Sequence, residues 1–428
     1  MDTSCLHPRD EILQLMERIY SYRMTTTSGG NLSLREDNGD LWITPARVDK
    51  GSLRREDIVC VRADGSVEGT RPPSSELPLH QAIYRARPDI QGIVHAHPVA
   101  LVAFSLAHRV PDTRLFHQAR HVCGEGGFAP YELPGSDALG RSVAIAFASG
   151  PNSVILENHG VVTAGATLQE AFQRFETFEF TGKTLIKARQ IGDVRFLSDE
   201  RIELPQRTHR PLPEFERGPM SSAEKELRQR LCDFVRRSYR QRLFISTWGT
   251  ISARLDERSF VITPYQADRA AIQPVELVLV QDGAAEAGST PSRAAALHRA
   301  IYRRHSTVGA IISGYPVNAT AFSVTGAEFD VRTIPESYVV VRRAGRAPYG
   351  LQFEHPEAIS EMISVEQPAL ILENDGVLVT GSGILEAFDR LEVLESTAEA
   401  IINCRAVGAL TPMPDDAIRE LEEAFFRR

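Results

Sequence analysis

Cysteine is scarce in this chain of 428 residues, which contains Cys5, Cys60, Cys123, Cys232 and Cys404. No two of them have the spacing of a CxxC redox pair or a zinc knuckle, which argues against both kinds of site. Scattered thiols without a pairing framework are typical of a reducing compartment, so we expect a cytoplasmic protein.

Long apolar runs and an excess of basic residues are also missing. No stretch approaches the about 20 apolar residues of a membrane-spanning helix, and the first residues lack the apolar segment of a signal peptide. A net charge of −8 gives no basic surface for nucleic acid or an anionic membrane. With 42% hydrophobic and 24% charged residues the composition is that of a globular protein. We therefore expect a small-molecule substrate as partner, and neither nucleic acid nor membrane.

The chain repeats itself once. The segment "LHQAIYRA" at 79–86 returns as "LHRAIYRR" at 297–304, and "VILENHGVVTAG" at 154–165 returns as "LILENDGVLVTG" at 370–381. The offset between matching residues stays between 216 and 219. A period of this length indicates the duplication of a whole domain, not a solenoid of short repeats.

A stretch rich in proline, arginine and serine separates the two copies. We predict a first domain over residues 1–205, a linker over 206–222 and a second domain over 223–428. Helical apolar spacing over 10–22 and 167–189 alternates with short apolar segments that end at glycine or proline. Interleaved helices and strands predict an α/β domain, with a mixed rather than purely parallel sheet.

The stretch "IVHAHP" carries two histidines in an apolar strand. Residues i and i+2 of a strand point to the same face, so His95 and His97 project together. His159 follows another apolar strand in "LENHG", where Gly160 permits a sharp turn, and Glu76 begins a helix in "SSELPLH". Three imidazoles and one carboxylate are a donor set that suits a zinc-type ion.

Buried histidines are often core residues instead of ligands, and the repeat helps to choose between these readings. Pro98 and Gly160 match Pro316 and Gly376 in the second copy, so the framework is retained. The four candidate ligands all change together, to Ala294, Ser313, Tyr315 and Asp375. Packing gives histidines no reason to disappear as a set, whereas an abandoned metal site does. We therefore predict a metal site in the first copy only.

The motifs "TSGGNLSLR", "ITP", "PPSSELPLH", "VHAHP" and "ENHG", in this order, resemble the class II aldolase/adducin family. The family contains sugar-phosphate aldolases, ribulose-phosphate epimerases and decarboxylases. The resemblance implies two tandem three-layer α/β/α domains around a mixed, mostly antiparallel sheet. It also implies an oligomer, and we expect a dimer that forms a pseudo-tetramer, because aldolases of this family are often tetramers.

By this resemblance, His95, His97 and His159 hold Zn²⁺, with Glu76 as fourth ligand or as catalytic acid and base. Mn²⁺, Co²⁺ and Fe²⁺ accept similar ligands. A hydroxy-carbonyl substrate chelates the ion, which stabilises the enediolate left by C–C cleavage while the carboxylate moves a proton.

We thus predict a metal-dependent, aldolase-type lyase for a small sugar phosphate or sugar-acid-like compound. Glutamate at position 76 favours an aldolase, because the epimerase branch typically carries aspartate there. A decarboxylase, an epimerase or a non-catalytic adducin-like protein are the alternatives.

The resemblance also suggests a phosphate pocket, in which backbone N–H groups and hydroxyls near a helix start would bind the anion. Its candidates are Gly30, Asn31, Ser74 and Ser75. The alternative is a tight turn next to a helix cap.

Two departures from the family pattern bear on the substrate and on the proton donor. Arg47 stands where a glycine is usual, and it either contacts a substrate anion or is a solvated surface residue. The tyrosine acids of family aldolases have no obvious equivalent, so His117 or His121 is a candidate acid, with a structural role as the alternative.

Overall fold

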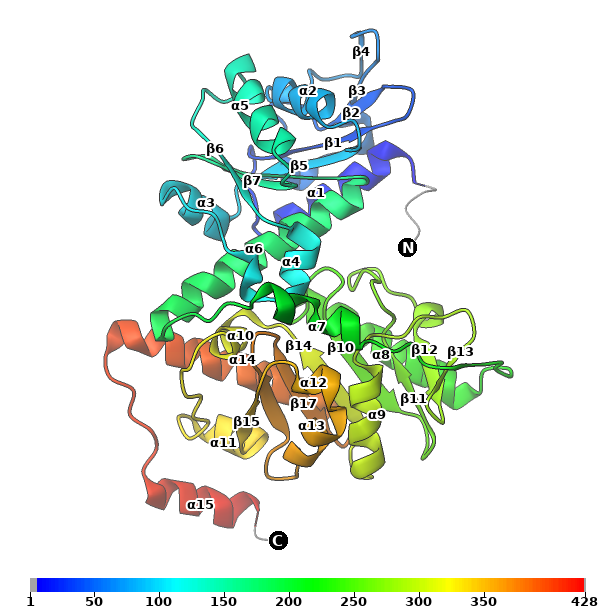
Figure 1. Cartoon of the computed structure of the whole chain (residues 1–428), viewed down its shortest axis with the longest axis vertical. Coiled ribbons are helices and arrows are strands. Elements are labelled where there is room, and N and C mark those ends of the chain that lie inside the picture. Colours follow the sequence, from blue (N-terminus) through cyan, green and yellow to red (C-terminus); the bar gives the residue numbers. More distant parts are fainter. Residues whose placement is uncertain (1–5, 427–428) are drawn as a thin grey trace. The chain divides into compact units, whose positions relative to one another are not determined.

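The computed structural model describes residues 6–426 and divides them into two compact units (Figure 1). The N-terminal unit contains the described residues up to 113 together with 118–183, and the C-terminal unit contains 114–117 and the described residues from 184 onward. None of the helices in this part of the chain is both long and apolar enough to cross a bilayer.

The N-terminal unit is built on an 8-stranded sheet of order β4-β3-β2-β1-β5-β8-β7-β6. Strands β6 and β7 pair in parallel, and the other neighbours pair antiparallel, which confirms the expected mixed, mostly antiparallel sheet. The strands are β1 Asn31–Arg35, β2 Leu41–Ile43, β3 Val59–Val61, β4 Val67–Glu68, β5 Gly92–Ala96, β6 Gly127–Ala129, β7 Ser153–Leu156 and β8 Gly160–Gly165.

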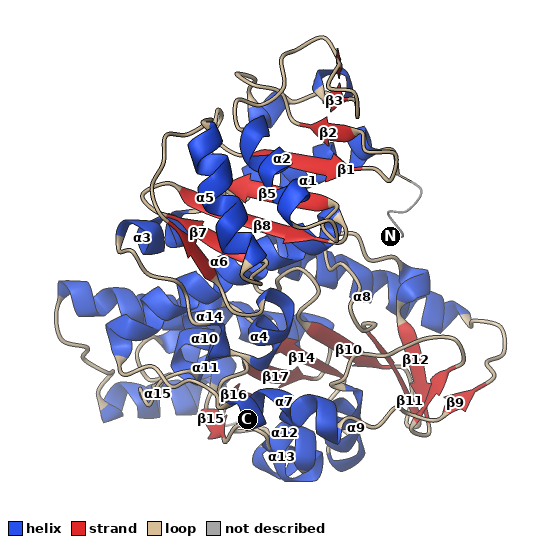
Figure 2. Ribbon diagram, turned by 45° about the horizontal axis from the view of Figure 1, so that its top comes forward, coloured by secondary structure: helices blue, strands red, loops and turns tan. Residues whose placement is uncertain are grey.

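Helices cover both faces of this sheet, as Figure 2 shows. Successive residues of β5 enter opposite cores, since Ile93 packs in the cluster with α2 and α5 and Val94 in the cluster with α1, α3 and α6. The helices are α1 Pro8–Ser21, α2 Leu77–Ala86, α3 Val99–Leu106, α4 His117–Cys123, α5 Asp137–Ala148 and α6 Leu168–Ile191. The predicted three-layer α/β/α arrangement is confirmed.

The C-terminal unit repeats this sheet and adds one strand. Its 9-stranded order β15-β16-β17-β14-β10-β11-β12-β13-β9 matches the first sheet strand for strand, with β9 at the extra edge. The strands are β9 Glu214–Phe215, β10 Thr250–Arg254, β11 Ser259–Ile262, β12 Val278–Gln281, β13 Ala284–Glu286, β14 Ala310–Gly314, β15 Ala344–Ala347, β16 Ala369–Leu372 and β17 Val377–Gly381.

Helices α9 and α13 pack on one face of the second sheet, and α8 and α14 on the other. The helices are α7 Asp199–Thr208, α8 Ser222–Arg240, α9 Ala295–Arg304, α10 Val317–Ser323, α11 Pro335–Val341, α12 Leu351–Glu354, α13 Pro356–Met362, α14 Ile384–Val407 and α15 Asp415–Phe425. Short 3-10 helices are η2 Lys50–Ser52, η3 Arg55–Asp57, η4 Thr113–Leu115 and η5 Pro274–Glu276.

The segment 206–222, expected to be a linker, contains regular structure. It includes the end of α7, the short strand β9 and the first residue of α8, and β9 pairs in parallel with β13 of the C-terminal sheet. The domain limits 1–205 and 223–428 therefore stay a prediction from the repeat.

Candidate active site

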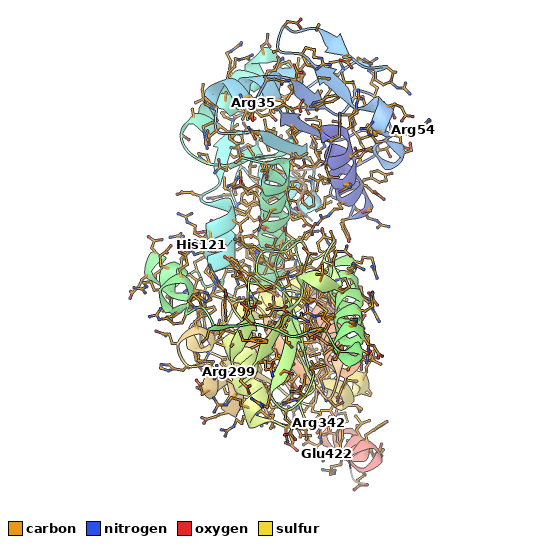
Figure 3. The ribbon with its side chains drawn as sticks, turned by 90° about the vertical axis from the view of Figure 1, so that its right-hand side faces the viewer. Arg35, Arg54, His121, Arg299, Arg342 and Glu422 are labelled. Atoms are coloured by element: carbon orange, nitrogen blue, oxygen red, sulfur yellow. The ribbon has the colours of Figure 1, made fainter. Side chains whose placement is uncertain are left out.

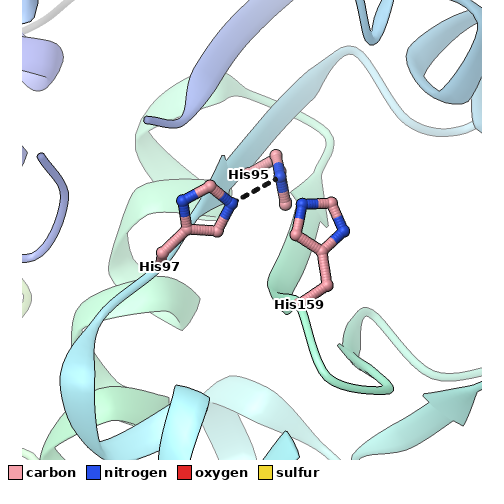
Figure 4. A group of neighbouring side chains, drawn as sticks. All are labelled: His95, His97 and His159. Carbon is pink, nitrogen blue, oxygen red and sulfur yellow. Dashed lines mark hydrogen bonds between the residues drawn. The ribbon is translucent and has the colours of Figure 1, made fainter. Parts of the chain in front are cut away.

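Three histidines of the N-terminal unit lie together at the ends of neighbouring strands (Figure 4). His95 is in β5, His97 follows the end of that strand, and His159 is in the turn between β7 and β8. One ring nitrogen of each lies within 4.8 Å of the others, and the Nε2 atoms of His95 and His97 are 3.2 Å apart. Strands β5 and β8 are hydrogen-bonded neighbours, so the sheet itself brings together residues more than sixty positions apart.

The turn that presents His159 differs from the one expected. Asn158, with φ of 53°, takes the left-handed conformation, which asparagine tolerates better than most residues. Gly160 serves another purpose, because a Cβ there would lie 2.6 Å from Cδ2 of His97 and 2.7 Å from the carbonyl oxygen of Ala96. The glycine makes room for the histidine pair, and the asparagine makes the turn.

A second glycine next to the histidines was not singled out from the sequence. A Cβ on Gly29 would approach Nδ1 of His97 to 2.9 Å. Gly30, which follows it, has φ of 73°, so the "SGGN" segment combines close approach with a left-handed residue. The run of two glycines was the signal that could have identified this wall of the site.

Glu76 directs its carboxylate at the histidines from the position just before α2. Its Oε2 is 3.0 Å from Nε2 of His95, and its Oε1 is 3.6 Å from Nε2 of His159. Oε1 is buried and has no hydrogen-bond partner among the described residues. A buried carboxylate oxygen without a donor needs another partner, and a bound cation would supply one.

The charges at this cluster are set by burial and by mutual attraction. Burial raises the pKa of Glu76, but the charge of His95 and hydrogen bonds from His95 and Asn31 outweigh it and hold the pKa well below its usual range. Burial, with the charge of His95, lowers the pKa of His97 to about 3 and that of His159 to about 4. Burial lowers the pKa of His95, but the charge of Glu76 and the hydrogen bonds to Glu76 and Val161 outweigh it and raise that pKa. The ionised carboxylate and the neutral imidazoles of His97 and His159 are therefore already in the forms that bind a metal, whereas His95 would have to release a proton.

The backbone also prepares His95 as a ligand. Its Nδ1 hydrogen-bonds to the carbonyl oxygen of Val161 at 2.9 Å, which leaves Nε2 facing His97 and Glu76. A hydrogen bond from the second ring nitrogen to a carbonyl is the usual way of orienting a metal-binding histidine. The donor set and its orientation therefore fit a divalent cation.

The phosphate-pocket candidates lie around the same carboxylate. Asn31 is 4% exposed and donates from Nδ2 to Oε2 of Glu76 at 2.7 Å. Oγ of Ser74 accepts from the backbone N–H of Glu76, while Ser75 is exposed. Asn31 thus supports Glu76, a role that its place in a glycine-rich turn did not reveal.

Arg47 is exposed and has φ of 55°. The left-handed backbone explains why a glycine is usual at this position of the family. Gln266, its counterpart in the second copy, has φ of 54°. Both copies therefore keep the turn with a side chain that is strained there.

The two candidate acids differ in their surroundings. His117 belongs to the C-terminal unit, where its ring is 5.3 Å from that of Phe353 and 6.3 Å from that of Tyr349. His121, labelled in Figure 3, is exposed on α4. Aromatic packing of His117 agrees with the structural alternative that its sequence context left open.

Comparison with protein families places both copies in one group. The model of the "Class II Aldolase and Adducin N-terminal domain" matches residues 10–186 and again residues 229–402. The chain belongs to the class II aldolase/adducin family. The two matches also confirm the tandem duplication.

Several characterised members of the class II aldolase family are similar to this chain. The 5-deoxy-D-ribulose 1-phosphate aldolase of Bacillus thuringiensis is 31% identical over 201 residues, 46% of this chain and 92% of that protein. The L-fuculose phosphate aldolase of Methanococcus vannielii is 32% identical over 178 residues, 40% of this chain and 92% of that protein. The 3-oxo-tetronate 4-phosphate decarboxylase of Haemophilus influenzae is 29% identical over 202 residues, 46% of this chain and 95% of that protein.

The second class II aldolase domain has a different set of contacts at the matching positions. Tyr315 donates its hydroxyl to Oδ1 of Asp375 at 2.9 Å, and Gln352 donates to Oδ2 at 3.0 Å. Two of the three side chains that replace the histidines, Tyr315 and Asp375, thus hydrogen-bond to each other, in contrast to the candidate cation site of the first copy.

Proposed function

We propose that the protein is a divalent-metal-dependent lyase that cleaves a C–C bond of a small sugar phosphate or sugar-acid-like hydroxy-carbonyl compound. The observation that carries the proposal is the carboxylate of Glu76, whose two oxygens lie 3.0 and 3.6 Å from nitrogens of His95 and His159. Family members that are named sugar-phosphate aldolases support the reaction type.

In this proposal His95, His97 and His159 hold the ion, with Glu76 beside it. Zn²⁺ is the favoured ion because the donors are three imidazoles and a carboxylate, and Mn²⁺, Co²⁺ or Fe²⁺ are substitutes. When bound, the ion supplies positive charge for a substrate carbonyl and hydroxyl.

The two oxygens of Glu76 have different tasks. Oε2 accepts a hydrogen bond from Asn31 and is thereby fixed, whereas Oε1 has no hydrogen-bond partner among the described residues. We assign to Oε1 the transfer of the substrate hydroxyl proton, since a general base needs a free lone pair within reach of its proton.

Phosphate binding is assigned to the turn beside the cation site. Gly30 and Asn31 on one strand end and Ser74 and Ser75 before α2 are the candidates, with Arg47 as an exposed guanidinium. Backbone N–H groups of a glycine turn and hydroxyls near a helix start suit an anion.

Decarboxylation is the second candidate, because one similar family member is a 3-oxo-tetronate 4-phosphate decarboxylase. Both reactions need the same electrostatic help for negative charge that develops next to a carbonyl. Release of CO₂ instead of an aldehyde from the substrate distinguishes them.

The assembly and the cellular location remain predictions. We expect two chains to form a pseudo-tetramer with two active and two inactive sites, and a fully active monomer in light scattering would contradict this. A cytoplasmic location rests on the scattered cysteines, of which Cys60, Cys123, Cys232 and Cys404 are free thiols.

Metal analysis of the purified protein tests the cation site. We expect about one divalent ion per chain, because the donor set is present in one copy only. His97→Ala should lose the ion and keep the fold, and Tyr315→Phe, the matched change in the second copy, should keep the ion. Stoichiometric metal in His97→Ala would overturn the assignment.

A panel of sugar phosphates and hydroxy-keto acids tests the reaction. The metal-loaded protein is incubated with each compound, and the product masses are followed. We expect an aldehyde and a smaller ketone or acid from at least one compound, with no turnover by His97→Ala. A metal-loaded protein that transforms none of them would favour the adducin-like alternative.

A further inference from the structure

A series of buried hydrogen bonds connects Tyr84, in helix α2, to Glu76. The hydroxyl of Tyr84 lies 2.8 Å from Oγ of Ser33, which lies 2.6 Å from Nδ1 of His80. Nε2 of His80 hydrogen-bonds to Oδ1 of Asn31, whose Nδ2 donates to Oε2 of Glu76 at 2.7 Å. Ser33 and His80 are each 0% exposed, so water does not compete with these bonds.

In this series of hydrogen bonds, the donor and the acceptor of each bond can be assigned. The carboxylate of Glu76 accepts hydrogen bonds and donates none, so Asn31 must present its NH₂ group to it. Oδ1 of Asn31 then faces His80 and requires an N–H from Nε2. Burial lowers the pKa of His80 to about 3, so the ring is neutral, and its Nδ1 accepts from Ser33.

The second copy keeps the beginning of this series and lacks its end. Tyr302, Ser252 and His298 repeat the contacts, at 2.8 Å between the two hydroxyls and 2.7 Å from Ser252 to Nδ1 of His298. Nε2 of His298 then meets the hydroxyl of Ser313 at 3.2 Å, with neither an asparagine nor a carboxylate beyond it. The tyrosine–serine–histidine part is therefore common scaffold, and the asparagine–glutamate part belongs to the candidate site.

We propose that His80 is a positioning residue of the active site, which holds the amide of Asn31 in the one orientation that donates to Glu76. This inference rests on the proposed function and deepens it. With the N–H of His80 in place, a flipped amide would set Oδ1 against the carboxylate and NH₂ against the imidazole N–H. Oε2 of Glu76 is thereby fixed, and Oε1 is left for the proton of the substrate.

Two polar variants separate the positioning role from a role in packing. His80→Gln can place an N–H near the former Nε2, whereas His80→Asn reaches only the position of Nδ1. We expect kcat of His80→Asn to fall about 10-fold to 100-fold, as for other residues that orient an active-site ligand, with KM and metal content nearly unchanged. His80→Gln should recover most of kcat.

The second copy supplies the matched controls. His298→Asn and His298→Gln make the same changes in the same scaffold, and they should destabilise the fold as much while leaving kcat unchanged. Equal kcat in His80→Asn and His80→Gln would overturn the positioning role, as would a loss of kcat that follows stability alone.

A spectroscopic readout keeps this inference separate from the proposed reaction. With ¹⁵N-labelled asparagine, the side-chain NH₂ signal of Asn31 should shift in His80→Asn and return in His80→Gln. If no compound is turned over by any form, the proposed function fails while this signal still tests the orientation of Asn31. An unchanged signal in both variants would overturn the inference.

Discussion

The two halves of this chain have the same fold, but they differ at the positions of the candidate metal ligands. Both sheets have the same strand order, and both keep a buried tyrosine–serine–histidine contact with matching distances. His80 and His298 are retained because the fold uses them, whereas His95, His97 and His159 are replaced together. The comparison separates the histidines that both scaffolds share from those that only the candidate cation site contains.

The positions of the second copy that match the candidate ligands are filled by a hydrogen-bonded group. In the C-terminal unit Asp375 accepts hydrogen bonds from Tyr315 and Gln352 and is 6% exposed. A site that binds a cation must keep buried oxygen and nitrogen lone pairs without donors, which costs stability in the absence of the ion. In the second copy the oxygens of Asp375 at the matching place have hydrogen-bond donors.

The largest expected effect is on turnover at Glu76. Glu76→Gln keeps the shape of the side chain and removes its basicity, so kcat should fall by about 10²- to 10⁴-fold. Steady-state kinetics with the substrate found in the panel measures it. The position that matches Glu76 in the second copy is Ala294, so the control is Asp375→Asn, which changes the carboxylate at the position that matches His159. It should leave kcat unaltered, and a comparable loss there would mean that the second copy takes part in turnover.

A smaller effect concerns two capping carboxylates that occupy matching positions in α6 and α14. Glu179 accepts from the backbone N–H groups of Ala100 and Leu101 and is 3.2 Å from the ammonium of Lys183. Glu395 accepts from Asn318 and Ala319, but Glu399 stands where the lysine would be. Burial, with a minor contribution from Glu399, raises the pKa of Glu395 to about 7. Burial also raises the pKa of Glu179, but the charge of Lys183 opposes that rise.

The C-terminal unit should therefore lose stability as the pH rises from 4.5 to 7, because its folded form binds a proton that the unfolded chain has released. We expect a decrease of about 2–3 kcal/mol in the free energy of unfolding from this group. Glu399→Lys should reduce the decrease, since an ammonium favours the ionised carboxylate. Urea unfolding at several pH values measures the decrease in the unsubstituted protein and in Glu399→Lys. The same dependence of unfolding free energy on pH in these two proteins would contradict the assignment.

The smallest expected effect is one that the two halves share. The hydroxyls of Tyr84 and Tyr302 each donate to a buried serine, and an arginine lies over each ring, at 4.8 Å for Arg35 and 4.7 Å for Arg254. Tyr84→Phe and Tyr302→Phe should each lower the free energy of unfolding by about 1–2 kcal/mol, the cost of a lost buried hydrogen bond. Neither should change kcat, and an effect confined to one half would show that the scaffolds are less alike than their contacts indicate.

The sequence predicted the sheet type, the duplication and the four residues of the candidate site. These predictions were possible because they rest on the alternation of residues along a strand, on the order of the motifs and on the internal repeat. All three can be read directly along the sequence. The cap of α6 is equally local, because Thr167 accepts a hydrogen bond from the backbone N–H of Glu170, three residues away, at 3.0 Å.

The errors and omissions arose where residues far apart in the chain meet. The sharp turn before β8 is made by Asn158, and Gly160 is required by the space that His97 takes. Asn31 is bonded to Glu76, 45 positions away, a contact that no spacing rule contains. His80 was visible as a histidine retained in both copies, but its task required the hydrogen bonds around it.

The sequence alone determined the kinds of donor atoms and the strands in or beside which they lie, because these follow from residue types and their spacing. It also determined which copy contains the donors, because the two copies can be aligned with each other. The tertiary structure decided which oxygen of Glu76 is held and which is free, and in which direction the buried hydrogen bonds run. Those properties depend on the mutual orientation of side chains, which is fixed only when strands β1, β5 and β8 and helix α2 pack together.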